Sequence, residues 1–206
     1  MRFFTWWPTR KAALFVFAAV AWFASAGTGL WVVWAWDNRP GAAATPPLVW
    51  PQEGVVALAS DRPTLVLLAH PQCSCTQATL TELAEVLARA HVHPKTYVLF
   101  LKPQGFPADW SDTPLWQQAA ALPGVTVVRD DDGRKARQFG AETSGQVVLY
   151  DAHATLVFSG GITGSRGHAG ENAGRAAIVG FLNESAAGRR ATPVFGCSLF
   201  VNNEAA

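Results

Sequence analysis

Apolar and polar positions divide this chain into two unlike parts. Residues 12–36 form a run without a charged side chain, and about 20 apolar residues suffice for a helix to cross a bilayer. Beyond residue 54 the apolar positions come in short runs and periodic groups instead. Such patterns are typical of buried strands and amphipathic helices. We therefore expect one membrane segment joined to one folded domain.

The uncharged run predicts an uncleaved single-pass anchor. Arg2, Arg10 and Lys11 precede the run, and Asp37 follows it. The positive-inside bias then places the N-terminus in the cytoplasm and the folded domain in the periplasm, held at the inner (cytoplasmic) membrane. Tryptophans at both ends resemble the aromatic belts of membrane interfaces; they are Trp6, Trp7, Trp31, Trp34 and Trp36.

A cleaved signal peptide is the alternative. Ala24-Ser25-Ala26 fits a small-residue cleavage site, with cleavage after Ala26. The apolar run continues beyond that site as far as Trp34, which favours the anchor. Both alternatives export the domain to an oxidising compartment.

The soluble part is expected to follow a spacer. Prolines and consecutive alanines make residues 38–53 a semi-extended linker. The expected division is a cytoplasmic tip and anchor at 1–37, the linker at 38–53, a folded domain at 54–187, and a C-terminal tail with Cys197 at 188–206.

Within the domain, buried strands and helices are predicted to alternate before a hairpin and a last helix. The strands are expected at 64–69, 96–101, 125–128, 146–150 and 155–159, and the helices at 76–91, 114–122, 134–139 and 174–185. This order predicts an α/β fold with a mixed sheet and helices on both faces. The first helix has two candidate starts, a capping box of Thr79 with Glu82 or a start nearer Ser74.

The strongest chemical signal is the pair Cys73 and Cys75 between the first strand and the first helix. A helix N-terminus favours a thiolate over a thiol. Three cysteines are too few for a structural disulfide framework. The leading hypothesis is thiol–disulfide exchange, in which Cys73 attacks and Cys75 resolves. The ring that such a pair closes is small, and strain in it would make the disulfide easy to reduce.

The order of elements and the cysteine pair resemble the thioredoxin fold over roughly residues 55–185. The segment His70-Pro71-Gln72-Cys73-Ser74-Cys75-Thr76 stands where thioredoxins carry their redox motif. Residues 139–151 are similar to the family's segment around the strand that faces the motif. Residues 160–168 and 193–197 are similar to membrane-anchored thioredoxin-like proteins called RedB. The resemblance implies a disulfide oxidoreductase.

Two departures separate this chain from ordinary thioredoxins. The spacing is Cys-x-Cys, and Thr76 stands where the second family cysteine would fall. Ser144 and Gly145 occupy the neighbourhood of the family's cis-proline. A cis bond without proline costs about 2.5–4 kcal/mol, so a trans bond is expected there.

Several auxiliary roles follow from the neighbouring residues. A positive charge on His70, beside Pro71, would raise the thiolate fraction of the pair. The glycine-rich loop 159–174 is either tightly turned backbone or a lip that supplies Arg166 or His168 to a ligand. Cys197 is either a third redox partner or an idle tail thiol.

Two other functions stay open. Cys73, Cys75 and His70 would suit Cu(I), a soft cation that prefers thiolate ligands. A thiol peroxidase would instead recruit Thr76 and Arg166. Under the leading hypothesis no cofactor is expected, and the partners are protein thiols or disulfides of the periplasm and, through residues 12–36, the membrane. A net charge of +1 without a basic run gives no support for nucleic-acid binding.

Overall fold

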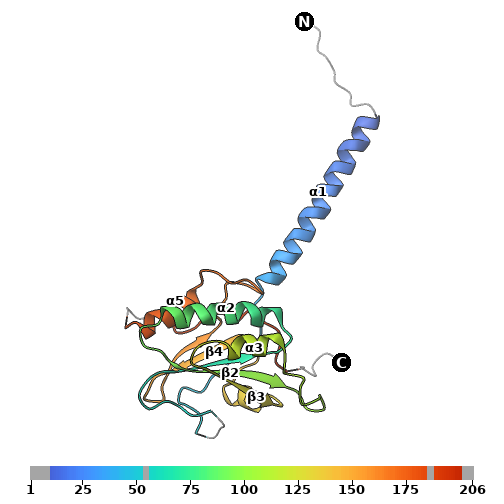
Figure 1. The fold of residues 1–206 in the computed structure, drawn as a ribbon. Helices are drawn as coiled ribbons and strands as arrows, with labels where there is room; N and C mark the ends of the chain where they lie inside the picture. The colour runs from blue at the N-terminus through green and yellow to red at the C-terminus, as the bar shows by residue number, and fades with distance from the viewer. Residues whose placement is uncertain (1–9, 53–55, 185–187, 201–206) are drawn as a thin grey trace. The chain divides into compact units, whose positions relative to one another are not determined.

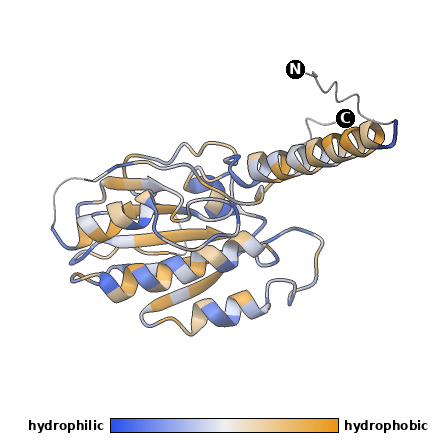
Figure 2. Cartoon of the chain, turned by 90° about the horizontal axis from the view of Figure 1, so that it is seen from above, coloured by the Kyte–Doolittle hydropathy of each residue, from blue (hydrophilic) through white to orange (hydrophobic). Residues whose placement is uncertain are grey.

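The computed structural model describes residues 10–52, 56–184 and 188–200, and the chain forms two compact units, residues 1–38 and 39–206. The first unit contains helix α1, Arg10–Asp37. Its 28 residues span about 42 Å at 1.5 Å per residue. Of the helices that the structure describes, α1 is the one long and apolar enough to cross a membrane, and Figure 2 shows how its hydrophobic residues surround the helix.

The second unit is built on a five-stranded mixed sheet in the order β3-β2-β1-β4-β5 (Figure 1). The strands are β1 Thr64–Ala69, β2 Lys95–Lys102, β3 Val125–Asp131, β4 Gln146–Tyr150 and β5 Leu156–Gly160. The helices are α2 Ser74–Arg89, α3 Pro114–Ala120, α4 Arg134–Gln138 and α5 Ala173–Leu182. Strands β1, β2 and β3 are parallel, whereas β4 is antiparallel to both β1 and β5. The predicted fold class and order of elements are confirmed.

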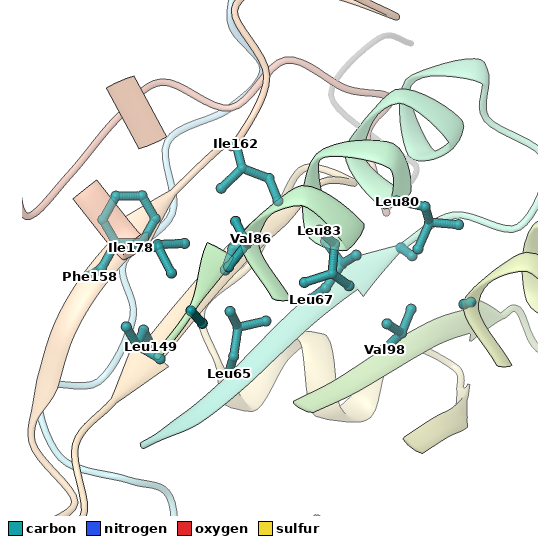
Figure 3. Packing of buried hydrophobic residues seen from close by; sticks show 14 of the residues in the cluster. Leu65, Leu67, Leu80, Leu83, Val86, Val98, Leu149, Phe158, Ile162 and Ile178 are labelled. Atoms are coloured by element: carbon teal, nitrogen blue, oxygen red, sulfur yellow. The ribbon is translucent and has the colours of Figure 1, made fainter. Parts of the chain in front are cut away.

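The central strand β1 supplies both halves of the core. All six of its residues are buried, and successive side chains point to opposite faces of the sheet. Leu65 and Leu67 pack with residues of α2, α3 and α5 (Figure 3). Val66 and Leu68 pack on the other face, where α4 contributes Ala136. The sheet therefore carries helices on both faces. Because β1 is the central strand, the turn between it and α2 lies at the centre of one end of the sheet.

Several element boundaries differ from the predicted ones. Helix α2 begins at Ser74, so the start nearer Ser74 is correct. The capping box is wrong because Thr79 already lies in the second turn, where its hydroxyl donates to the Cys75 carbonyl at 2.9 Å. Helix α5 begins at Ala173, because the Asn172 side chain accepts the Arg175 N–H at 2.8 Å and caps it.

Residues 39–52, assigned to the linker from the sequence, lie along the domain. The Gly41 N–H donates to the Val194 carbonyl at 2.8 Å, and the Thr45 N–H to the Gly140 carbonyl at 3.1 Å. Trp50 is buried in the second core cluster. The compact unit thus begins before residue 54. Backbone N–H and carbonyl groups that become buried need hydrogen-bond partners, and in this segment the domain provides them.

Candidate functional site: three cysteines at one helix terminus

The junction between β1 and α2 holds Cys73 and Cys75. Cys73 is the N-cap residue of α2, with extended backbone (φ −112°, ψ 125°) and no side-chain cap hydrogen bond. Cys75 lies in the first turn. Both residues are buried, with exposed fractions of 3% and 4%. Both sulfurs therefore lie at the helix end where unpaired N–H groups and the positive pole of the dipole favour a thiolate.

The C-terminal segment brings the third cysteine to the same place. The thiol of Cys197 hydrogen-bonds with the thiol of Cys73, and the backbone of Cys197 also contacts that sulfur. The Cys197 carbonyl accepts the Ser144 N–H at 2.8 Å. Gly196 makes this approach feasible, since a Cβ there would lie 1.8 Å from the Ser144 carbonyl oxygen. Cys197 joins the cysteine pair, although it lies far away in the sequence.

Hydrogen bonds distinguish Cys73 from its neighbours. Burial disfavours its thiolate, but the Cys197 thiol and the N–H groups of Cys197, Thr76 and Cys75 hydrogen-bond to the sulfur and hold the pKa of Cys73 below its usual value. Hydrogen bonds to the charged form of a thiol stabilise that form. Of the three thiols, Cys73 is therefore the one prepared to ionise.

The other two thiols are held in the protonated form. Burial, followed by the negative charge and hydrogen bond of Cys73, raises the pKa of Cys75. Partial burial of its thiol, then the hydrogen bond and negative charge of Cys73 and a further effect of Cys75, raise the pKa of Cys197 to about 12. The positive charge of Arg166 acts in the opposite direction on both. One thiolate with two protonated neighbours is the arrangement that these interactions favour.

The glycine-rich loop lies over the cysteines. The Gly167 N–H contacts Cys75, and the Arg166 guanidinium donates to the carbonyls of Gly196 and Arg39. His168 is exposed, with its Nδ1 2.6 Å from the Arg166 carbonyl. Of the two residues that the sequence offered for this loop, Arg166 acts on the thiols and His168 contacts Arg166.

A buried ion pair joins α5 to α2 at the end of this loop. The Arg175 guanidinium donates to the Glu82 carboxylate at 2.7 Å, and both side chains are almost fully buried. Glu82 also accepts the Gly170 N–H at 2.6 Å and the Asn172 side-chain amide at 3.0 Å. The sequence analysis assigned Glu82 to a capping box and did not identify this network.

No protein-family model matches the sequence, and no curated protein matches it significantly. An uncharacterised protein from Geobacillus kaustophilus matches the structure with a TM-score of 0.56 and 18% identity, over 82% of this chain and 95% of that one. A hypothetical protein from Sinorhizobium meliloti matches with a TM-score of 0.52 and 18% identity, over 80% and 96%. The sheet order and the succession of helices are those of the family that the sequence resembles. The fold is thioredoxin-like.

An exposed lipoprotein thioredoxin from Streptococcus pneumoniae also matches, with a TM-score of 0.44 and 17% identity, over 61% of this chain and 86% of that one. The closer resemblance to RedB-type proteins stays a prediction.

Ser144 and Gly145 lie in the loop that precedes β4, beside the turn that carries the cysteine pair. The peptide bonds of the described residues are all trans, including the one before Gly145. The Ser144 hydroxyl accepts the His70 N–H at 2.9 Å and shares a hydrogen bond of 2.9 Å with the Thr76 hydroxyl. Gly145 donates its N–H to the Leu68 carbonyl at 2.8 Å. A polar network thus fixes the loop that faces the cysteines.

His70 and Thr76 have structural roles in this network. Burial lowers the pKa of His70 below its usual value, which disfavours the positive charge expected from the sequence. Its Nδ1 accepts the Gln72 N–H at 3.2 Å, as the neutral ring requires. The Thr76 hydroxyl donates to the His70 carbonyl at 2.9 Å. Pro71 is buried in the turn between them.

An apolar pocket of about 530 Å³ opens beside His70. The His70 ring packs edge-on to Trp110 with centroids 5.4 Å apart, and Phe106 lies 5.2 Å from the same indole. Ser198, the residue after Cys197, lines the other side. For metal binding, the described part of the chain contains no group of three or more His, Cys, Asp or Glu side chains arranged to hold an ion.

Proposed function

We propose that the protein is a membrane-anchored extracytoplasmic thiol–disulfide oxidoreductase. The observation that carries this proposal is the Cys73 sulfur, which accepts several hydrogen bonds at a helix N-terminus and touches a second thiol. A thiolate is the nucleophile in disulfide exchange, and a neighbouring thiol completes the two-electron reaction.

The reaction follows from these contacts. The Cys73 thiolate attacks one sulfur of a substrate disulfide and forms a mixed disulfide, while the other substrate sulfur leaves as a thiolate and takes up a proton. A neighbouring cysteine, Cys75 in the sequence-based assignment, loses its proton and attacks Cys73. This step forms an intramolecular disulfide and releases the second substrate thiol. The substrate gains the two electrons that the cysteines lose, and the reverse sequence oxidises a dithiol.

Substrates are expected to be protein thiols or disulfides outside the cytoplasm. Cys197 lies at the surface, so a partner's disulfide has a path to the site. Apolar side chains on either side of such a disulfide could bind in the pocket beside His70. Helix α1 would keep the domain at the membrane, with the N-terminus inside.

The full-length protein in detergent provides the test of the chemistry. Equilibration with glutathione buffers of graded potential, followed by trapping of free thiols, should reveal a reversible disulfide that contains Cys73. Cys73→Ser should abolish it, whereas Ser111→Ala, at a buried residue outside the site, should not. The proposal is wrong if Cys73 stays reduced at every glutathione potential.

The same preparation separates the alternatives from the sequence analysis. An anaerobic Cu(I) titration that shows one tight equivalent, lost in Cys73→Ser, would favour copper binding. Rapid consumption of hydrogen peroxide by the reduced protein would favour a peroxidase.

The location is tested in cells that express the full chain. In a Cys73→Ser, Cys75→Ser background, which leaves Cys197 without a disulfide partner, a membrane-impermeant maleimide should label Cys197 from outside the cytoplasmic membrane. An N-terminal tag should stay with the membrane fraction if α1 is retained and be lost if cleavage follows Ala26. Labelling of Cys197 only after lysis of the cytoplasmic membrane would exclude export.

A further inference from the structure

We propose that Cys197, and not Cys75, closes the catalytic disulfide with Cys73. This inference rests on the proposed function and deepens it by naming the redox couple. It replaces the Cys-x-Cys pair, two residues apart, with a pair that joins the start of α2 to the C-terminal segment.

The backbone that carries Cys197 favours this partner. The Cys73 sulfur meets Cys197 through its thiol and its backbone N–H, and it meets Cys75 through the same two groups, so the choice between them rests on the backbone that holds each thiol. The backbone of the C-terminal segment is fixed beside it, since the Cys197 carbonyl accepts the Ser144 N–H and Gly196 packs on Ser144. Closing this disulfide shortens a contact that is already formed.

The backbone of Cys75 opposes the shorter ring. A disulfide between residues two positions apart suits only some backbone conformations. Here Cys75 lies in the first turn of α2, and its carbonyl accepts the Thr79 hydroxyl at 2.9 Å. The Cys73 carbonyl accepts the Thr76 N–H at 3.0 Å. The Cys75 thiol reaches the Cys73 sulfur as a hydrogen-bond donor. A Cys73–Cys75 disulfide would still have to close its small ring across backbone that these first-turn hydrogen bonds hold.

The electrostatics allow Cys197 to act at the second step. Burial is the first cause of the high pKa of Cys197, and the hydrogen bond and negative charge of Cys73 come next. Once Cys73 is in a mixed disulfide, that negative charge is gone while the attraction of Arg166 remains. The pKa of Cys197 then falls, and a thiol of intrinsically high pKa is a strong nucleophile when it ionises.

The step is balanced in atoms and electrons. Cys197 gives its proton to the departing substrate sulfur, and its sulfur attacks the Cys73 sulfur. The Cys73–substrate bond breaks, the Cys73–Cys197 bond forms, and the substrate leaves as a thiol. Cys75 stays protonated and donates its S–H to the Cys73 thiolate before the reaction, which makes it a positioning residue.

The test uses the full-length protein in detergent with oxidised glutathione as the probe. Trypsin cuts after Arg89 and Arg190, so Cys197 lies on a separate peptide from Cys73 and Cys75. A disulfide to Cys197 joins two tryptic peptides that reduction separates. A Cys73–Cys75 disulfide stays within one peptide.

We expect joined peptides in the wild type and in Cys75→Ser. In Cys197→Ser we expect the Cys73–glutathione adduct to accumulate, with loss of turnover. Loss of the reversible disulfide in Cys75→Ser, together with its retention in Cys197→Ser, would overturn this inference and leave the proposed function intact. No disulfide in any form of the protein would instead overturn the proposed function. Far-UV circular dichroism and the melting temperature of each variant establish that it is folded, and Cys197→Ala provides a second replacement.

Discussion

The two halves of the thiol site are built by different means. The half that carries Cys73 and Cys75 is local, because one buried strand runs directly into one helix. The half that carries Arg166 and Cys197 is assembled at long range by hydrogen bonds between a loop, a tail segment and α2. The local half supplies the nucleophile. The distant half adds hydrogen-bond donors that lower the pKa of the nucleophile and, in our inference, supplies its partner, so the chemistry depends on contacts that local sequence does not specify.

The largest expected effect is a loss of stability when the buried ion pair between Arg175 and Glu82 is broken. Glu82→Gln leaves the Arg175 guanidinium buried with the exposed Glu171 as its remaining charged partner among the described residues. Loss of one member of a buried pair costs about 3–5 kcal/mol. Chemical denaturation of the full-length protein in detergent should show a loss of this size.

Glu85→Gln on the same helix is the matched control. Glu85 pairs with Arg89 at 3.0 Å in an exposed setting, and exposed pairs contribute about 0–1 kcal/mol. Equal losses of stability in the two variants would mean that the buried Glu82 pair contributes no more than the exposed Glu85 pair.

Particular residues show how far the sequence predicts this structure. The strand 64–69 and the thiols at the start of α2 were predicted because apolar runs and helical periodicity are local signals. The partner of Glu82 lies 93 positions away, and periodicity carries no information about such pairs. Its position in a Thr-x-x-Glu pattern led instead to the wrong capping box. The same limit applies to Cys197, whose position beside Cys73 is a long-range contact of the fold.

A smaller effect is expected where the tail crosses the Ser144 loop. In Gly196→Ala the new Cβ would lie 1.8 Å from the Ser144 carbonyl oxygen, so backbone must shift. Overpacking of this kind costs about 1–3 kcal/mol. Stability and the yield of the Cys73–Cys197 disulfide should both fall, as denaturation and peptide mapping would measure.

Gly164→Ala provides the contrast, since a Cβ there meets nothing within 4 Å. At such compatible positions alanine stabilises a protein by about 0.4–1 kcal/mol. If Gly196→Ala is as benign as Gly164→Ala, the tail does not depend on its contact with Ser144.

Arg166 should affect rates more than stability. Arg166→Met removes the positive charge that lowers the pKa of Cys75 and of Cys197. The second step, release of glutathione from Cys73, should therefore slow, while formation of the mixed disulfide changes little. Stopped-flow mass analysis separates the two steps. His168→Ala, at an exposed residue, should leave both unchanged, and a slowed first step in Arg166→Met would show that the charge acts on Cys73 instead.

The smallest effect concerns the pH dependence of Cys73. Its pKa lies below the usual value because donors outweigh burial, and the Cys197 thiol is the first of these donors. In a Cys75→Ser background, Cys197→Ala removes that donor and so raises the pKa of Cys73. Less thiolate is then present at neutral pH, and alkylation by iodoacetamide slows there but recovers as the pH rises through the new pKa. Cys197→Ser keeps a hydroxyl donor and should preserve more of the lowered value. Alkylation profiles that coincide for the alanine and serine variants would mean that the side chain at position 197 does not activate Cys73, and that backbone N–H groups lower its pKa instead.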